Sequence, residues 1–547
     1  MSLSLQFVGW ALLAAAMVWP LRDAGVKTSA PTLGWKWWLL VGAVLLIFRW
    51  PMLWVRHELN VDESQLIAGA LTLRHDSVFW RSVDGSTAGP FDFYPLLVAA
   101  WTQGAASYAI ARLLALACAW ATVIFTAETL TLMGGATVAR AAALPALAFY
   151  AFTREPDFAH YSTETVPVLL LAAAGYATVR QATTPSRANP WIVGLLLGAV
   201  PWAKLQGAPL AAVLGAFAVA QEISAARTRA VSALVIGAVL PSLAVAFVTV
   251  VTGQTEHALT AYFANAFAYV AATGPTFGEV AVLDWNNAVR EGQLALWLTG
   301  GIGFMLLAPV LAAESSVVLR RWCLAAAGLL VAAVACVLIP RRPFCHYLLL
   351  VIWPFALATG AGLALAAHRT ATAVSRRTLA IIGLFLVFTV IPQIADHVFG
   401  EDSFAGANAA RPRAETQKLI GTLRDLTRPG DSLAVWGWRS SLYVEAGLRQ
   451  ATRQAHSEAQ LFSSPRQPFF LNTYYDDITA ANPPVFADAV GPHGFKFTDR
   501  AQAHEVFPPL RKWIAAHYTL VADLDGTRLY LRNDRLTSRT PPAATRP

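Results

Sequence analysis

The sequence predicts an α-helical polytopic membrane protein with about twelve spanning helices, followed by a smaller α/β domain. Three observations support this fold class. The 547 residues are 56% hydrophobic and only 14% charged, which is unlike an ordinary soluble domain. Apolar windows long enough to cross a hydrocarbon core of about 30 Å recur from Leu3 to Ile394. After Ile394 these windows stop, and short helix and strand patterns follow.

The distribution of positive charge predicts the orientation of the chain. The net charge of +8 does not indicate nucleic-acid binding, because Lys and Arg residues lie in short loops and in the tail. Arg22 and Lys27 follow the first window, so that loop is placed in the cytoplasm and the loop from Asn60 to Tyr94 outside it. Basic and non-basic loops then alternate along the predicted crossings, which are 3–21, 37–55, 109–133, 139–152, 166–179, 191–205, 208–223, 230–251, 294–313, 322–339, 347–367 and 378–394.

These patterns predict three regions along the chain. Residues 1–395 form a transmembrane domain whose first outer loop, 56–108, carries juxtamembrane helices, one of them over 95–104. Residues 536–547 are predicted to be disordered. Residues 396–535 form an extracytoplasmic α/β domain, with helices at 414–426, 440–447 and 507–518, strands at 432–438 and 483–489, and a hairpin turning at Asp525-Gly526. The first window lacks a basic start and a cleavage pattern, so it is read as a membrane helix rather than a signal peptide.

The acidic pair Asp62-Glu63 is the main candidate for chemistry, because a carboxylate just outside a membrane helix can act as a base. A structural interpretation competes with this one. Asn60 can cap a helix with Glu63 in its third position, and Asp62 would then favour the positive end of that helix. The spacing alone does not choose between the two roles.

Two further outer segments carry candidate substrate-binding residues. Turns at Asp84-Gly85 and Gly89-Pro90 can bring Asp92 and Tyr94 back toward Asp62. The alternative is a surface loop entering an aromatic belt, and this alternative is favoured for Asp92 taken alone. In the second outer loop, Asp157, His160 and Glu164 would share one face of a helix. Their types favour hydrogen bonding to a polar substrate over a metal, because no second ligand cluster accompanies them. The four cysteines show no metal or disulfide spacing and are read as packing residues.

Three cations lie at outer helix ends, where the charge rule does not expect them: Lys204, Arg341 and Arg342. Such residues either extend to lipid head groups or hold an anion in a cavity, and a lipid-linked phosphate would suit the second role. The flanks of Lys204 resemble a helix broken around a cavity, which favours the anion.

Together these residues resemble the GT-C superfamily of membrane glycosyltransferases, in particular bacterial relatives of protein O-mannosyltransferases and lipid A aminoarabinose transferases. The matching features are Asp62-Glu63, the turn and juxtamembrane helix from Gly89 to Leu97, Ala111-Arg112-Leu113, the second-loop Asp157, the late His346-Tyr347 pair, and the tail segment VWGWRSSLYVEAG. The resemblance covers most of the chain as order and topology.

The resemblance implies an inverting transfer of a sugar from a polyprenyl phosphate to an extracytoplasmic glycan, lipid or protein hydroxyl. It implies that Asp62 is the base, that Asp157 is the second-loop acid, and that cations hold the donor phosphate. Where relatives often carry Lys-Pro-Pro, this chain has Ala88-Gly89-Pro90, so Lys204 or the arginine pair takes the phosphate role. A DxD motif is absent from the first loop, so a divalent metal is compatible but not indicated.

The sequence therefore predicts an enzyme of the bacterial inner membrane whose partners are membrane lipids, the lipid-phosphate sugar and the acceptor, with no nucleic acid. Two other classes remain open. A transporter or flippase of a lipid-linked or small solute would show repeated helix sets with charges at the bilayer midplane, and the charges here cluster at helix ends instead. A membrane scaffold whose tail binds cell-wall polymers would not need Asp62.

Overall fold

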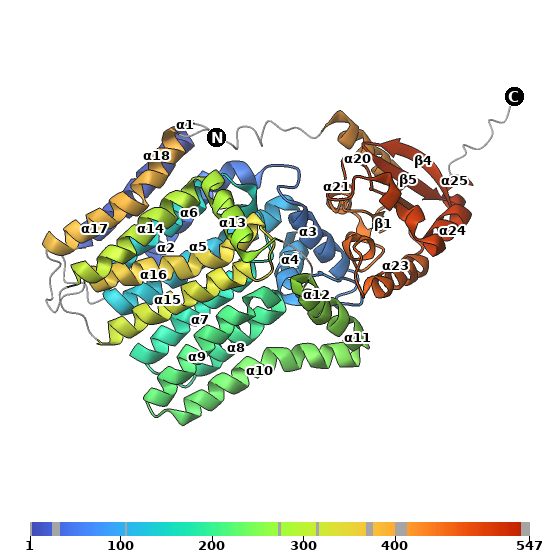
Figure 1. Cartoon of the computed structure of the whole chain (residues 1–547). Coiled ribbons are helices and arrows are strands. Elements are labelled where there is room, and N and C mark those ends of the chain that lie inside the picture. The colour runs from blue at the N-terminus through green and yellow to red at the C-terminus, as the bar shows by residue number, and fades with distance from the viewer. Residues whose placement is uncertain are drawn as a thin grey trace. The chain divides into compact units, whose positions relative to one another are not determined.

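The structure is a computed structural model that describes residues 3–23, 33–103, 107–271, 275–312, 317–367, 376–399 and 413–537. Lys27 and residues 538–547 of the predicted disordered tail lie outside these ranges. The chain divides into two compact units (Figure 1). The first, called the membrane unit, comprises 1–54, 112–248 and 269–408. The second, called the outer unit after its predicted location, comprises 55–111, 249–268 and 409–547.

The segments predicted as membrane crossings are helical over most of their length, although 378–394 is divided between two helices at Val390. Among the described residues, eight helices are long and apolar enough to cross a membrane. The helices of the membrane unit and its borders are α1 (Leu3–Asp23), α2 (Trp35–Leu53), α5 (Tyr108–Gly134), α6 (Ala136–Phe152), α7 (Thr165–Thr183), α8 (Asn189–Ala203), α9 (Ala208–Ser224), α10 (Thr228–Val251), α13 (Phe277–Glu291), α14 (Gln293–Leu311), α15 (Val317–Leu338), α16 (Leu349–Ala367), α17 (Arg376–Thr389) and α18 (Ile391–Phe399).

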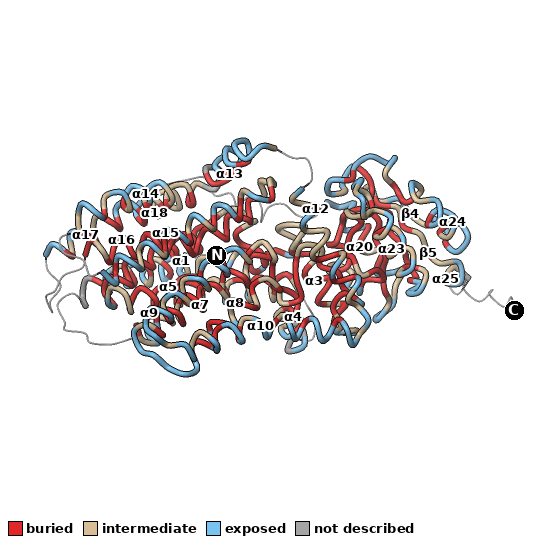
Figure 2. Tube along the Cα trace, turned by 60° about the horizontal axis from the view of Figure 1, so that its bottom comes forward, coloured by how far each residue is buried: buried red, intermediate tan, exposed pale blue. Residues whose placement is uncertain are grey.

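Helix α16 forms the centre of the membrane unit. Its sequence is apolar on all sides, as expected for a helix surrounded by other helices, and nearly all of its residues are buried. Figure 1 shows α14, α15 and α16 side by side, and both neighbours pack against α16. By contrast, Leu243 and Phe247 on α10 are exposed, which suits a face turned toward lipid. Figure 2 shows pale blue, exposed residues on α13 and α14 as well.

Helices α8 and α10 approach closely because α8 carries glycines four residues apart. A Cβ added to Gly194 or Gly198 would collide with the backbone of Leu234 or Ala238, respectively, on α10. This small-residue spacing is the one that lets membrane helices bring their backbones together.

The outer unit is built on a five-stranded sheet of order β2-β1-β3-β5-β4. Strands β2 and β3 pair parallel with β1, β5 pairs antiparallel with β3, and β4 pairs antiparallel with β5. The strands are β1 (Ser432–Trp436), β2 (Arg449–Gln450), β3 (Val485–Asp488), β4 (Tyr518–Leu524) and β5 (Thr527–Arg532), and the helices of the tail are α20 (Ala414–Leu426), α21 (Ser441–Ala446), α22 (Glu458–Leu461), α23 (Gln467–Ala481), α24 (Pro508–His517) and α25 (Asn533–Thr537).

The sequence pattern identified β1, β3, the hairpin and the helices α20, α21 and α24, each within about two residues. It missed β2, which has two residues and no pattern of its own. It also missed α22 and α23. The α23 sequence QPFFLNTYYDDITAA is rich in aromatic and β-branched residues, and only a weak apolar stripe marks it as helical.

The first outer loop is part of the same unit as the tail. It forms α3 (Val61–Leu73) and α4 (Pro90–Gln103), the latter starting five residues before the predicted helix because Pro90 suits a first helical turn. Helix α3 packs on α21 and β2. Its Ala68 joins the apolar cluster on one face of the sheet with Leu433 and Val435, and its Val61 packs against the cluster on the other face.

Candidate functional site

In the membrane unit, Lys204 lies at a break in the helical path, as the sequence predicted. Helix α8 ends at Ala203, Lys204 has an extended backbone, and the short helix η2 (Leu205–Gly207) leads into α9. The Lys204 side chain is buried. Its ammonium donates to Thr163 Oγ1 at 2.6 Å and to the Glu164 carboxylate, both in the loop between α6 and α7.

The late His-Tyr pair joins the same cluster from η4 (Cys345–Leu348). The Lys204 ammonium lies over the Tyr347 ring, 4.5 Å from its centroid. His346 stacks on Phe344, and its Nδ1 lies 3.5 Å from the Asp157 carboxylate. Three loops that are far apart in the sequence therefore meet at one place.

Glu164 is fully buried and is held as a carboxylate by this cluster. Burial alone would raise its pKa, but the charges of Lys204 and His346 together with the Lys204 hydrogen bond lower the pKa below its usual range. The predicted helical face over the second outer loop is not formed, because only Pro156–Phe158 takes a short 3-10 turn. His160 and Glu164 nevertheless converge, since both line one cavity.

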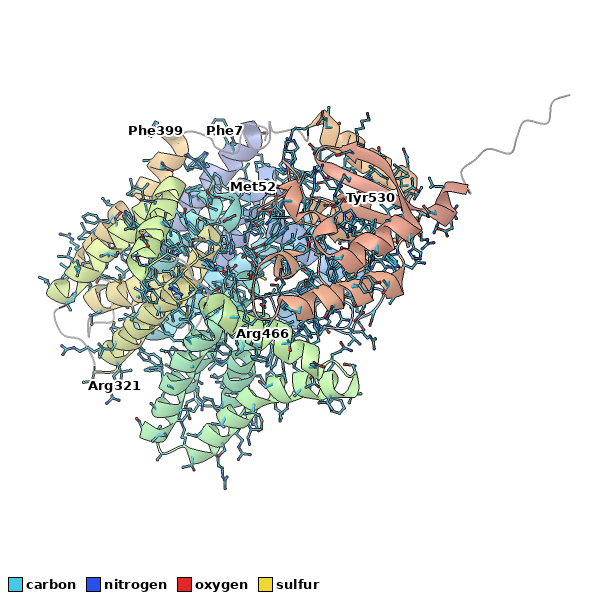
Figure 3. The ribbon with its side chains drawn as sticks, turned by 45° about the vertical axis from the view of Figure 1, so that its right-hand side comes forward. Phe7, Met52, Arg321, Phe399, Arg466 and Tyr530 are labelled. Carbon is cyan, nitrogen blue, oxygen red and sulfur yellow. The ribbon has the colours of Figure 1, made fainter. Side chains whose placement is uncertain are left out.

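That cavity has a volume of about 40 Å³, enough for a few water molecules, and it lies within the membrane unit. One part of its wall is polar, with Arg49, Arg112, His160 and Glu164, and the rest is largely apolar. Met52, at the end of α2 and labelled in Figure 3, belongs to the lining. The cavity therefore places buried charged and polar side chains directly beside an apolar wall.

His160 presents a defined nitrogen to this cavity. Its Nδ1 donates to the Pro156 carbonyl at 2.9 Å, so Nε2 is the ring nitrogen that this hydrogen bond does not use. Nε2 is buried and has no hydrogen-bond partner within the part of the chain that the structure describes.

Two buried arginines in the cavity wall were not proposed as site residues from the sequence. Arg49 donates to the carbonyls of Thr153 and Phe158 at 3.3 and 3.1 Å, and Arg112 donates to the Met52 carbonyl at 3.1 Å. A single arginine inside the apolar run of α2 is the signal that could have identified Arg49, because such charges usually mark an interior site.

The arginine pair predicted to bind phosphate behaves differently from Lys204. Arg341 has a left-handed backbone (φ 51°) and donates to the Val270 carbonyl at 3.3 Å. Arg342 lies over the Tyr269 ring, 5.0 Å from its centroid. These contacts connect the pair to residues 269–270.

In the outer unit, Asp62 and Glu63 occupy the first turn of α3, and the predicted cap is present. Asn60 Oδ1 accepts from the Asp62 amide at 2.8 Å. The Glu63 carboxylate is buried and accepts from the Leu59 amide at 3.1 Å, one residue before the expected Asn60 amide. Glu63 therefore has a capping function, whereas Asp62 is only partly buried.

Asp92 and Tyr94 are integrated into the folded loop. Asp92 lies in the first turn of α4 with no exposed surface, and the Tyr94 hydroxyl donates to the Ser77 carbonyl at 3.0 Å. The turn residue Asp84 is buried as well. Its Oδ2 lies 3.2 Å from His257 Nε2 and accepts from Gln454 Nε2 at 2.9 Å. The burial of Asp92 and the hydrogen bond of Tyr94 both fit a structural role in this loop.

Glu58 is a second acid of the outer unit that the sequence interpretation passed over. Withdrawal from water raises its pKa to about 7; the nearby Glu445 and Glu63 add to the rise, and a 2.5 Å hydrogen bond from Ser64 opposes it. Ser64 also bonds the Tyr108 hydroxyl at 2.9 Å. The sequence signal that could have identified Glu58 is its position four residues before Asp62.

One group of acids and histidine in the described residues has ligand atoms within 4.8 Å of one another: Asp488, His504 and Glu505. Arg528 already supplies a cation there, because its guanidinium pairs with Asp488 at 2.5 Å and with Glu505 at 2.7 Å. We assign this group a structural role at the end of β3.

Comparison with known proteins establishes the fold. No protein-family model and no curated protein matches the sequence. The solved structure of ArnT from Cupriavidus metallidurans bound to undecaprenyl phosphate is similar, with a TM-score of 0.63 and 12% identity over 93% of this chain and 99% of that chain. The same protein in the apo state gives a TM-score of 0.59 and 13% identity over the same shares. The chain therefore shares the fold of this ArnT structure, which confirms the predicted fold of membrane helices followed by a smaller α/β domain.

Proposed function

We propose that this protein is an inverting glycosyltransferase that moves a sugar from a polyprenyl-phosphate donor to an acceptor hydroxyl outside the cytoplasm. The observation that carries the proposal is the buried Lys204 cluster of the membrane unit, beside a cavity that combines arginine, histidine and apolar walls. The fold shared with an ArnT structure that contains undecaprenyl phosphate supports a donor of the same class.

The proposed reaction needs a base at the acceptor and a cation at the leaving group. An acceptor hydroxyl attacks the anomeric carbon, the bond from that carbon to the phosphate oxygen breaks, and the electron pair leaves with the phosphate. Asp62 takes the hydroxyl proton, which makes the oxygen a better nucleophile. Lys204 stabilises the negative charge that develops on the leaving phosphate, and Arg49 and Arg112 add positive charge along the cavity wall.

Glu164 sets the resting state of this arrangement. It neutralises Lys204 before the donor arrives, because an isolated buried ammonium would be costly. A phosphate then competes with Glu164 for the same ammonium, so the cluster discriminates for an anion that can replace a carboxylate. Asp157 and His346 hold the η4 segment that carries Tyr347.

The test compares Asp62→Asn with the neighbouring Glu63→Gln. Asp62→Asn should lower transfer at least about 100-fold while the protein keeps its melting temperature, because only the base is removed. Glu63→Gln should mainly lower the melting temperature, because it weakens the cap. Mass spectrometry of copurified lipid should find a sugar-loaded polyprenyl phosphate enriched on Asp62→Asn, whose donor is bound but not consumed.

Full turnover by Asp62→Asn would remove Asp62 from the mechanism. A transporter or flippase gives a different result, since lipid-linked sugar would move across vesicles containing Asp62→Asn at the wild-type rate and no released polyprenyl phosphate would accumulate with either protein.

A further inference from the structure

The sheet of the outer unit has a topological switch point that the proposed reaction does not use. In the order β2-β1-β3, the chain leaves β1 toward β2 on one side and later returns to β3 on the other. In open α/β sheets, ligands bind outside the carboxyl ends of two such strands, where the connections separate. A ligand site of this kind would be formed by the segments that follow β1 and β3, residues 437–440 and 489–497.

The residues after β1 and β3 are joined into one aromatic surface. Gly437 has φ 95°, a conformation that favours glycine, and it turns the chain so that Trp438 follows. The Trp438 carbonyl accepts from the Phe495 amide at 3.2 Å. The Trp438 ring stacks on His456, with centroids 4.0 Å apart and planes at 12°, and meets Phe495 edge-on at 5.0 Å.

His456 offers a hydrogen-bond donor at this surface. Its Nδ1 accepts from the Glu458 amide at 3.2 Å, so the proton of the neutral ring is on Nε2. Burial lowers the pKa of His456, which keeps the ring neutral at pH 7. Within the described part of the outer unit, Nε2 has no hydrogen-bond partner.

Lys496 is held beside these rings in a conformation that costs energy. Its backbone is left-handed (φ 62°), which is unusual for a residue with a side chain. Its ammonium lies 4.8, 5.6 and 5.9 Å from the ring centroids of Trp438, Phe495 and Phe462. Glu458 neutralises it at 2.8 Å. Phe462 and Phe495 remain 52% and 40% exposed, so their rings reach the surface beside the cation.

The same part of the outer unit carries Asp62. Val61, the residue before it, packs against the apolar cluster that contains Trp438 and Phe497. The Asp62 carboxylate is also one of the charges that act on His456. The base of the proposed reaction and the aromatic surface thus belong to one neighbourhood of one unit.

We propose that Phe462, Phe495, Lys496 and His456 form a subsite for a sugar ring of the acceptor, which presents its hydroxyl to Asp62. Aromatic faces take the apolar side of a pyranose, and the Nε2–H and ammonium donate to its hydroxyl and ring oxygens. A neutral ligand fits better than a phosphate, because Glu458 already balances the charge of Lys496. The role of Asp62 in this inference rests on the proposed function, whereas sugar binding does not.

The binding test uses the full chain in lipid nanodiscs and three neutral disaccharides: maltose, cellobiose and diacetylchitobiose. Saturation-transfer NMR should detect binding of at least one of them to the wild type. Phe495→Ala and His456→Phe should each weaken that binding about tenfold, the second while keeping the stack on Trp438. Leu520→Ala, which changes an exposed apolar residue of β4, should leave it unchanged.

Two results would overturn the subsite: no saturation of any of the three sugars by the wild type, or displacement of a bound sugar by millimolar inorganic phosphate. Binding of undecaprenyl phosphate is measured on the same samples to separate the two proposals. Lipid binding without sugar binding removes the subsite and leaves the proposed function. Sugar binding without lipid binding or transfer removes the proposed function and leaves the subsite.

Discussion

The Lys204 ammonium lies 4.5 Å from the centroid of the Tyr347 ring and is buried together with Glu164, so a single cation is held at once by a carboxylate, a hydroxyl and an aromatic face. Such a cation costs little to bury while Glu164 is present. The same geometry leaves it available to any anion that can replace that carboxylate. This relationship gives the sharpest test of the membrane unit.

Replacing Lys204 by Met should destabilise the protein by about 3 to 5 kcal/mol, because the buried Glu164 carboxylate loses its counter-charge. The double variant Lys204→Met with Glu164→Gln should recover most of that loss, since no unpaired charge remains. Neither variant should copurify with polyprenyl phosphate. The measurements are detergent melting curves and lipid mass spectrometry, and a stable double variant that binds the lipid as well as wild type would contradict a phosphate role.

Replacing His160 by Asn should distinguish the roles of its two ring nitrogens. The Asn amide can keep the hydrogen bond that Nδ1 makes to the Pro156 carbonyl, but it removes the Nε2 nitrogen from the cavity. Transfer should fall about tenfold with little change in melting temperature. His517→Asn is the matched control, because His517 Nδ1 makes the same type of bond to the Trp513 carbonyl at 2.9 Å on an exposed helix. Equal activity of the two variants would limit His160 to a structural role.

Glu58 predicts a pH dependence of stability in the outer unit. Its pKa of about 7 in the folded protein lies above the ordinary 4.5, so the folded state binds more protons between these values. The free energy of unfolding should therefore fall as pH rises from 4.5 to 7 and be constant above pH 7. The total decrease is up to about 3 kcal/mol. Glu58→Gln removes this slope, so its melting temperature should rise relative to wild type as pH increases from 5 to 8.

The control for this experiment is Glu415→Gln, a change at an exposed residue in the first turn of α20. Its melting temperature should follow the wild-type pH profile. Parallel profiles for Glu58→Gln and the wild type would show that the environment of Glu58 does not favour its protonated form.

Close packing of α8 on α10 predicts an unusual sensitivity at a small residue. Gly198→Ala should destabilise the membrane unit by roughly 1 to 3 kcal/mol, because the new methyl group meets the Ala238 backbone, which cannot move aside like a flexible side chain. Gly215→Ala on α9 should be tolerated, since its Cβ would lie 3.5 Å from Leu197 Cδ1, an ordinary contact. Similar melting temperatures for both variants would contradict the tight crossing.

The fold of this protein was predictable to the extent that it depends on local pattern. Apolar windows of membrane length located the helices, and the alternation of strand and turn residues located β1, β3 and the hairpin at Asp525-Gly526. The α3 cap was predictable because Asn60 and Glu63 lie three residues apart. By contrast, β2 is defined by its pairing with β1 and has little pattern of its own.

The candidate site shows the same division. Charge alternation selected Lys204, because its charge lies at the end of a helix where the rule does not expect it. Position in the predicted outer loops and the family resemblance selected Asp62 and the second-loop acids. Only the tertiary structure decided that Glu164, Lys204 and Tyr347 meet, that Arg341 and Arg342 contact residues 269–270, and that Arg49 and Arg112 line the cavity. The physical reason is range: periodicity and capping act within a few residues, whereas burial of a charge depends on partners that folding brings from distant loops.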